Sequence, residues 1–332
     1  MDKLEALNSI SRLSDNVVRV LGQNPGKFTL QGTNTYIIGK RNPYVLVDTG
    51  EGRGEYVAVL ESALRETAIS TNSDEPHISD IILSHWHQDH VRGLPSVLVL
   101  LKRLWDERKH TEPFKPPRLH KFPISAGIVS PKYQVLSSVI DHLPAGSFTP
   151  TADGRPLHDL IDSQQFLDFR VLHTPGHTDD SICLYIPDDE ALYTADSVLG
   201  QGTAVFEDLS HYISSLQKML EFGEGTQTPY SYRRLYPGHG PVVEEGKQLI
   251  STYIRHRVER EEQIVALLRT PNQPSWTTWS LVSKIYSAYP ESLWLPAAHS
   301  VDLHLKKLEK DGVVNRLDGA DEHTSWGLAL KL

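Results

Sequence analysis

The chain has 332 residues, of which 39% are hydrophobic and 23% charged, with a formal net charge of −9 at pH 7. These proportions are ordinary for a globular protein with a sizeable core, and the acidic excess makes nucleic acid an unlikely partner. No stretch approaches the roughly 18 apolar residues of a membrane span, no signal-peptide pattern opens the chain, and the single cysteine, Cys183, excludes an internal disulfide. We therefore expect a cytoplasmic protein that makes no membrane contact.

The first chemically informative segment follows a short strand. Residues 80–84 form an apolar, β-branched run bounded by polar residues, which predicts a buried strand, and the sequence His-Trp-His-Gln-Asp-His at 85–90 comes directly after it. A helix would scatter these side chains around its circumference, whereas a loop at a strand end can fold them around one point. Imidazole and carboxylate groups suit Zn²⁺ and similar first-row divalent ions. The segment therefore predicts part of a metal site.

A basic, proline-containing segment at about 102–121 then interrupts the alternation of strands and helices. It runs from Lys102 to Lys121 and contains seven Lys or Arg residues against three Asp or Glu residues. This composition suggests an inserted surface loop. Because concentrated positive charge attracts acidic partners, the segment is a candidate contact for one.

Three further strands end close to a residue that could bind a metal. His177 and His239 each follow a strand through a Pro-Gly turn, and Asp196 ends a strand at 191–195. Together with the loop, they give seven candidate ligands: His85, His87, Asp89, His90, His177, Asp196 and His239. Seven are too many for one tetrahedral zinc, whose catalytic sites use three protein ligands and an open position. They fit two metals if one carboxylate is shared.

From about residue 246 the chain is predicted to be mainly helical. Apolar spacing indicates helices over 248–268, 276–286 and 297–310, and the segments 313–317 and 326–330 could pair as a hairpin. We therefore expect a catalytic domain over 1–245, including the basic insertion, and a winged-helix-like region over 246–332. The last helix carries four basic or imidazole side chains that either face nucleic-acid phosphates or form a solvated surface: His304, Lys306, Lys307 and Lys310.

The order of the ligands resembles that of the metallo-β-lactamase superfamily. The resemblance implies an α/β fold, the αββα sandwich, with a dinuclear site that takes two Zn²⁺ by default, Mn²⁺ and Fe²⁺ being compatible. By position it implies two sets of ligands: His85, His87 and His177 for the first ion, Asp89, His90 and His239 for the second, and Asp196 as the bridge. Asp48, after the strand 44–47, matches the family's buried aspartate that orients the ligand loop, although it could be a simple turn carboxylate.

Three segments, at 24–36, 173–180 and 199–209, narrow the resemblance to one subgroup. It contains the β-lactamase-like endoribonucleases of animal mitochondria and the lactamase-type thioesterases of fungal polyketide pathways. The family usually has two glycines after the ligand loop, whereas this chain has Arg92 before Gly93. We expect the arginine to make the mouth of the pocket narrower and more cationic.

The implied chemistry is metal-dependent hydrolysis. Two such ions activate water for attack on an acyl or phosphoryl centre, with Asp89 as a proton shuttle. No side-chain nucleophile is needed, in agreement with the lack of a Gly-x-Ser-x-Gly motif. The acidic chain, Arg92 and the basic segment favour a thioesterase that releases an aromatic polyketide from the acyl carrier domain of a non-reducing polyketide synthase, with the carrier contacting 102–121. The alternatives are a single-strand endoribonuclease and a glyoxalase-II-like hydrolase of glutathione thioesters.

Overall fold

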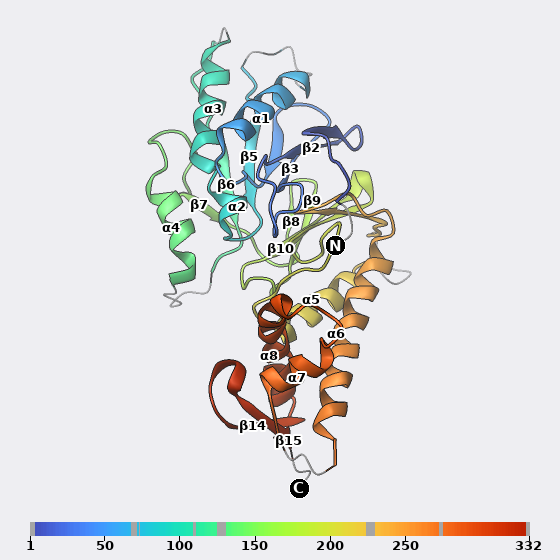
Figure 1. Cartoon of the computed structure of the whole chain (residues 1–332). Helices are drawn as coiled ribbons and strands as arrows, with labels where there is room; N and C mark the ends of the chain where they lie inside the picture. Colours follow the sequence, from blue (N-terminus) through green and yellow to red (C-terminus); the bar gives the residue numbers. More distant parts are fainter. Residues whose placement is uncertain are drawn as a thin grey trace.

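A computed structural model describes residues 4–67, 72, 74–108, 111–124, 131–223, 230–271 and 275–329. These residues form two large sheets packed face to face, with helices on both outer faces, and a smaller unit of helices and short strands at the C-terminal end (Figure 1). The α/β sandwich and the helical appendage that the sequence predicts are both confirmed. No helix in these ranges is long and apolar enough to cross a bilayer.

The first sheet carries its strands in chain order: β1 (Ile10–Arg12), β2 (Val17–Leu21), β3 (Asn34–Ile38), β4 (Tyr44–Val47), β5 (Ile78–Leu83), β6 (Arg118–Lys121) and β7 (Leu157–Asp159). Pairing is antiparallel from β1 to β4 and parallel from β4 to β7. The carboxyl ends of β4 and β5 therefore meet at one edge, which is where Asp48 and the loop 85–90 leave the sheet. The helices that follow these strands are α1 (Gly54–Thr67), α2 (Gln88–Val91), α3 (Leu94–Asp106) and α4 (Gln134–Asp141).

The second sheet has the order β12-β11-β10-β9-β8. Its strands are β8 (Gln165–Phe166), β9 (Phe169–His173), β10 (Ile182–Ile186), β11 (Ala191–Ala195) and β12 (Arg234–Pro237). Because β11 and β12 are parallel neighbours, Asp196 and the turn to His239 also leave the sheet at a shared edge. Two helices cover its outer face, α5 (Leu209–Glu221) and α6 (Gly246–Leu268).

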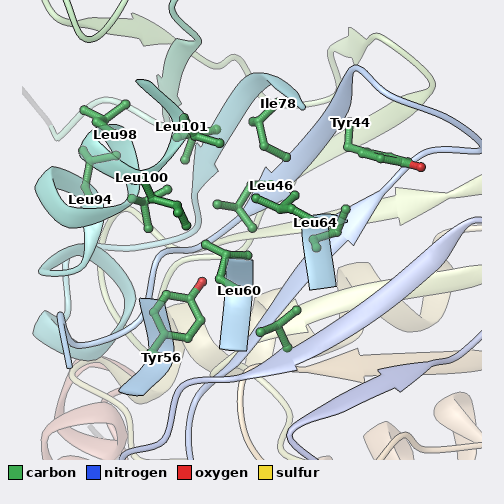
Figure 2. Packing of buried hydrophobic residues seen from close by; sticks show 14 of the residues in the cluster. Tyr44, Leu46, Tyr56, Leu60, Leu64, Ile78, Leu94, Leu98, Leu100 and Leu101 are labelled. Carbon is green, nitrogen blue, oxygen red and sulfur yellow. The ribbon is translucent and has the colours of Figure 1, made fainter. Parts of the chain in front are cut away.

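Apolar side chains fill three layers of the sandwich. Between the sheets, the fully buried rings of Tyr36 and Tyr193 meet edge to face at 5.6 Å. On the outer face of the first sheet, Leu60 of α1 lies close to Leu46 of β4, with Leu98 of α3 in the same cluster (Figure 2). Burying each of these side chains contributes about 1.5–3 kcal/mol. The result is a rigid frame from which the loops at the shared edge project.

The C-terminal unit has its own core around the buried Trp326. It comprises α7 (Thr278–Ile285), α8 (Trp294–Lys310), β13 (Trp276–Thr277), β14 (Val314–Asp318) and β15 (Ser325–Leu328), so the predicted helices and hairpin are present and the residues before α7 add a short strand. Helix α6 contributes to two cores, Ile250 to that of the second sheet and Ile264 to that of the C-terminal unit. Short 3-10 helices cover Pro131–Tyr133, Pro187–Asp189, Glu291–Leu293 and Asp321–His323.

The interpretation of 102–121 as an inserted loop is wrong. Its first residues complete α3, because the buried Leu104 and Trp105 extend the apolar face of that helix, and its last four residues are β6. Its described basic side chains also have partners: Lys102 pairs with Asp106 at 2.5 Å and Arg118 with Asp80 at 2.8 Å. Lys109 lies outside the described residues. The segment therefore contains the end of a helix and a strand, which its basic composition did not reveal.

Candidate metal centre

The structure brings the predicted ligands and Asp48 to one edge of the sandwich. Asp48 follows β4 in a left-handed conformation with φ of 62°, which Asp tolerates better than most residues. The segment 85–90 follows β5, and Asp196 follows β11 directly. The prediction that this segment is a loop holds for His85–His87 but is wrong for Asp89 and His90, which lie in the short helix α2. His177 and His239 leave β9 and β12 through their Pro-Gly turns. Two groups of ligand atoms result, each gathered within 4.8 Å: His85, His87, His177 and Asp196 in one, and Asp89, His90 and His239 in the other.

Three imidazole nitrogens face one another in the first group. His87 Nδ1 lies 3.1 Å from His85 Nε2 and 3.0 Å from His177 Nε2, and the two Nε2 atoms are 3.3 Å apart. Zn–N bonds of 2.0–2.1 Å in a tetrahedron place the nitrogens about 3.3 Å from one another. The spacing therefore fits three ligands of one ion, with Asp196 Oδ2 at 3.6 Å from His177 Nε2 as a fourth.

Asp196 connects this group to the second. Its Oδ1 lies 3.3 Å from His90 Nε2, and its Oδ2 lies 3.2 Å from His239 Nε2. Asp89 Oδ2 closes the second group at 3.2 Å from His239 Nε2. The buried atoms His90 Nε2 and Asp196 Oδ1 make no hydrogen bond with any described residue. Since buried polar atoms normally have partners, these two atoms fit a bound cation.

The outer nitrogens of the histidines fix which nitrogen faces the centre. His177 Nδ1 donates to the Val205 carbonyl at 2.7 Å, and His90 Nδ1 donates to Asp48 Oδ2 at 2.7 Å. Ser84 Oγ gives its proton to Asp48 and so accepts from His85 Nδ1 at 2.9 Å. In the neutral form of each ring, Nε2 then carries the lone pair and directs it inward. Such outer partners orient metal-binding histidines and raise their basicity.

The two groups of candidate ligands differ in the charge of their imidazole rings. Burial, and then the neighbouring His177, lower the pKa of His87 to about 3, and burial together with His90 holds the pKa of His85 well below its usual range. His85 and His87 are therefore neutral at pH 7, and the neutral imidazole is the form that coordinates metal. Burial also disfavours the charged form of His239, but Asp196 outweighs it and raises the pKa of His239 to about 9. The second group attracts positive charge.

Asp48 lies under both groups and is fully buried. It accepts hydrogen bonds from the Ser84 backbone N–H and hydroxyl, each at 2.8 Å, as well as from His90 and from the Tyr193 hydroxyl. These contacts join β4, β5 and β11. Asp48 is therefore no simple turn carboxylate: it holds the ligand loop against both sheets.

Several supporting residues escaped the sequence prediction. Thr33 Oγ1 donates to Asp89 Oδ2 at 2.9 Å, and the Asn34 side chain donates to the carbonyls of Pro237 and Gly240, 2.9 Å each, on either side of His239. Both lie in the segment 24–36, on which the family resemblance partly rests. The sequence therefore indicated that this segment matters but not what these two side chains do. Gly238 is also required, because a Cβ there would lie 2.3 Å from Asp196 Oδ1.

A cavity of about 1080 Å³ opens onto these ligands. Its walls come from the loop 24–30, Trp86, Val135, the loop 199–207 and helix α8, which contributes His299, Leu303 and Lys306. The wall is largely apolar, with Phe28, Leu30 and Phe206 among its residues. Arg92 is exposed and does not line the cavity, so the expected narrowing of the mouth is wrong. None of the described residues of 102–121 lines it either, because the 13-residue helix α3 carries the chain about 20 Å away from the ligand loop.

Comparison with known proteins agrees with this architecture. The sequence model of the Metallo-beta-lactamase superfamily matches residues 28–271, and that of the Beta-lactamase associated winged helix domain matches 277–326. The chain is 36% identical over 320 residues to a Beta-lactamase-like protein 2 homolog of Drosophila melanogaster, covering 95% of this chain and 94% of the relative. It is 32% identical over 292 residues to an Atrochrysone carboxyl ACP thioesterase of Claviceps purpurea, covering 86% and 76%. A beta-lactamase domain protein from Burkholderia ambifaria shares the fold, with a TM-score of 0.68 at 16% identity over 99% of this chain and 96% of that one.

Proposed function

Because the chain belongs to the metallo-β-lactamase superfamily, we propose that it is a metal-dependent hydrolase that cleaves acyl thioesters, releasing an aromatic polyketide from an acyl carrier domain. The observation that carries this proposal is the large, mostly apolar cavity beside the ligand groups. Binding sites for organic ligands are typically concave, mainly apolar and about 300–1,000 Å³ in volume. An acyl group with a ring system would bury its surface there with the thioester over the ligands.

The described residues fit two divalent ions. We propose that His85, His87 and His177 hold one ion, that Asp89, His90 and His239 hold the other, and that Asp196 bridges them. When bound, such ions lower the pKa of a water molecule and polarise a carbonyl, Zn²⁺ being the default and Mn²⁺ or Fe²⁺ compatible.

The protein's own groups supply orientation and a proton carrier. Asp89 lines the cavity, and its Oδ2 is fixed by Thr33 and His239. We propose that this carboxylate takes up the proton released by the attacking water and passes it to the leaving group. A thiol has a pKa near 8.5, so it can leave as the thiolate with little such help. A thioester is therefore an easier substrate for this site than an ester or a phosphodiester. The relatives named as acyl carrier thioesterases support the same choice.

One observation favours the endoribonuclease alternative. Phe28 is 69% exposed at the cavity wall, and the Lys27 ammonium lies 5.6 Å from its ring centroid. An exposed aromatic ring beside a cation is suited to a stacked base of single-stranded nucleic acid. The helix α8 offers less support, because each of its lysines has an acidic partner: Lys306 pairs with Asp302, Lys307 with Glu261 and Lys310 with Asp208.

We expect hydrolysis of an aromatic acyl thioester on a carrier domain to exceed cleavage of single-stranded RNA by at least about 100-fold in kcat/KM. The reason is that the cavity offers apolar surface for an acyl group and few unpaired cations for phosphates. Release of free thiol and cleavage of labelled RNA, followed with the same metal-loaded preparation, measure the two activities, and S-acyl glutathione tests the glyoxalase-II-like alternative. Efficient RNA cleavage with all thioesters intact would reverse the proposal.

The cavity wall on α8 gives a second test. Leu303→Phe adds volume to a 9% exposed side chain that lines the cavity, so KM for a bulky aromatic thioester should rise about 10-fold, or ~1.4 kcal/mol of binding, while an acetyl thioester should be unaffected. The matched control is Leu295→Phe on the same helix, since Leu295 is 64% exposed and lies outside the cavity wall. Equal responses of both substrates would show that the acyl group binds elsewhere.

A further inference from the structure

Helix α6 packs on both the second sheet and the C-terminal unit, and it holds the loop that follows Asp196. Two of its residues, Tyr253 and Arg257, are four positions apart and so lie on one face of the helix. The Tyr253 hydroxyl donates to the Gly202 carbonyl at 3.0 Å and accepts from the Leu199 N–H at 3.3 Å. The Arg257 Nη2 donates to the Ala204 carbonyl at 3.2 Å. The loop is therefore fixed at three points by one helix. Helices α5, α6 and α8 pack against one another beside it (Figure 1).

The next residue in the loop that is held from the same side is Phe206. Its ring is 4% exposed and stacks on Tyr212 at 5.1 Å. The Arg257 guanidinium lies 4.8 Å from the ring centroid, and the buried His304 ring of α8 meets it edge-on at 6.4 Å. Phe206 is thus enclosed between the sandwich, helix α6 and helix α8.

Between Ala204 and Phe206 lies the carbonyl that orients a candidate metal ligand. Val205 O accepts the His177 Nδ1 proton at 2.7 Å. The Val205 side chain is 53% exposed and cannot anchor its own backbone. Its two neighbours, Ala204 and Phe206, both contact Arg257. Beyond them, the Glu207 N–H donates to the Gly176 carbonyl at 2.7 Å, so Arg257 holds the carbonyl from the side of α6.

We propose that Arg257 and Tyr253 are positioning residues for His177, so that helix α6, which joins the sandwich to the C-terminal unit, forms part of the support of the metal centre. The inference rests on the proposed role of His177 as a ligand. It follows because a shift of the 202–206 loop would move the acceptor that fixes the tautomer and ring orientation of His177. Changes to outer partners of metal-binding histidines typically lower metal affinity by about 10–100-fold.

The test measures metal retention, which is independent of any substrate. In protein loaded with Co²⁺, we expect Arg257→Ala to lose one of its ions to a chelator about 10-fold faster than the wild type, with a changed ligand-field spectrum for that ion. Tyr253→Phe, which removes one hydroxyl, should act in the same direction more weakly. Arg257→Lys should restore part of the retention, because it keeps a donor and a charge but not the planar stacking group.

The matched control is Arg255→Ala on the same helix, whose side chain is 61% exposed and pairs only loosely with Glu259 at 3.7 Å. Thermal unfolding of the metal-free proteins separates positioning from general loss of stability. Wild-type retention in folded Arg257→Ala and Tyr253→Phe, or equal loss in Arg255→Ala, would overturn the inference. If the wild-type protein binds no Co²⁺, the proposed metal ligands are themselves wrong, and this inference fails with them.

Discussion

Replacement of Asp196 by asparagine should remove at least one of the proposed ions and lower hydrolysis by more than about 100-fold, beyond the cost typical of an outer partner. Its two oxygens lie 3.3 Å from His90 Nε2 and 3.2 Å from His239 Nε2, and Oδ2 also faces the first group at 3.6 Å from His177 Nε2. Asparagine retains the shape of the side chain but replaces one oxygen by an NH₂ group, which donates protons and cannot bind a cation.

Metal content per chain, measured by elemental analysis after dialysis, checks this prediction together with thioester turnover. The control is Asp188→Asn, because Asp188 is a half-exposed carboxylate whose partner, Lys40 at 2.6 Å, lies on the surface. That variant should keep both ions and full activity. If Asp196→Asn also keeps its metal and turns over normally, a bridging role for Asp196 is wrong.

The candidate ligands could be predicted because each segment that carries them follows the end of a strand. Short apolar runs before His85 and Asp196 mark β5 and β11, and strands that run parallel to a neighbour deliver their carboxyl ends to a common edge. Imidazole and carboxylate groups at such ends are costly to bury unless something binds them. The positions of these residues after strands, together with their metal-binding side chains, were therefore enough to predict which residues the fold brings together.

The cavity could not be predicted in the same way, because its wall is assembled from distant segments. In the sequence, Leu303 is indistinguishable from the other apolar residues of an amphipathic helix. Only the packing of α8 against α5 and α6 places it beside the ligands. The paired lysines of α8 illustrate the same point. Lys310 has its acidic partner, Asp208, about a hundred residues earlier in the chain. Composition alone therefore could not show whether the positive charges on this face of α8 are paired with carboxylates.

The errors at Arg92 and at 102–121 have a related cause. The neighbours of Arg92 in sequence predict a place beside the ligands, yet Arg92 caps the short helix α2 and is exposed. Only its backbone carbonyl has a close neighbour in that region, because a Cβ on Gly52 would lie 3.1 Å from it. In 102–121 the basic and proline-rich composition outweighed the apolar periodicity of α3. In both places tertiary packing, which sequence spacing does not encode directly, decided the outcome.

The second large effect is expected at Asp48. Asp48→Ala removes the acceptor of four buried donors and places alanine at φ of 62°. Breaking a buried charged pair costs about 3–5 kcal/mol, so the free energy of unfolding of the metal-free protein should fall by about that amount. His90 Nδ1 would also lose its partner, and metal affinity should fall about 10–100-fold. Asp48→Asn, which tolerates the left-handed backbone and keeps one oxygen, should show smaller losses of both.

A buried carboxylate in the same sheet separates the two effects of Asp48. Asp80 is 1% exposed and holds Arg118 at 2.8 Å and His120 at 2.7 Å, but it lies five residues before His85, about 16 Å along the strand. Asp80→Ala should therefore lower the free energy of unfolding without changing the affinity for Co²⁺. Urea unfolding of the metal-free variants and titration with Co²⁺ measure the two quantities. If Asp48→Ala binds Co²⁺ as tightly as the wild type, or if Asp80→Ala loses affinity to the same extent, then Asp48 contributes only to stability and does not orient His90.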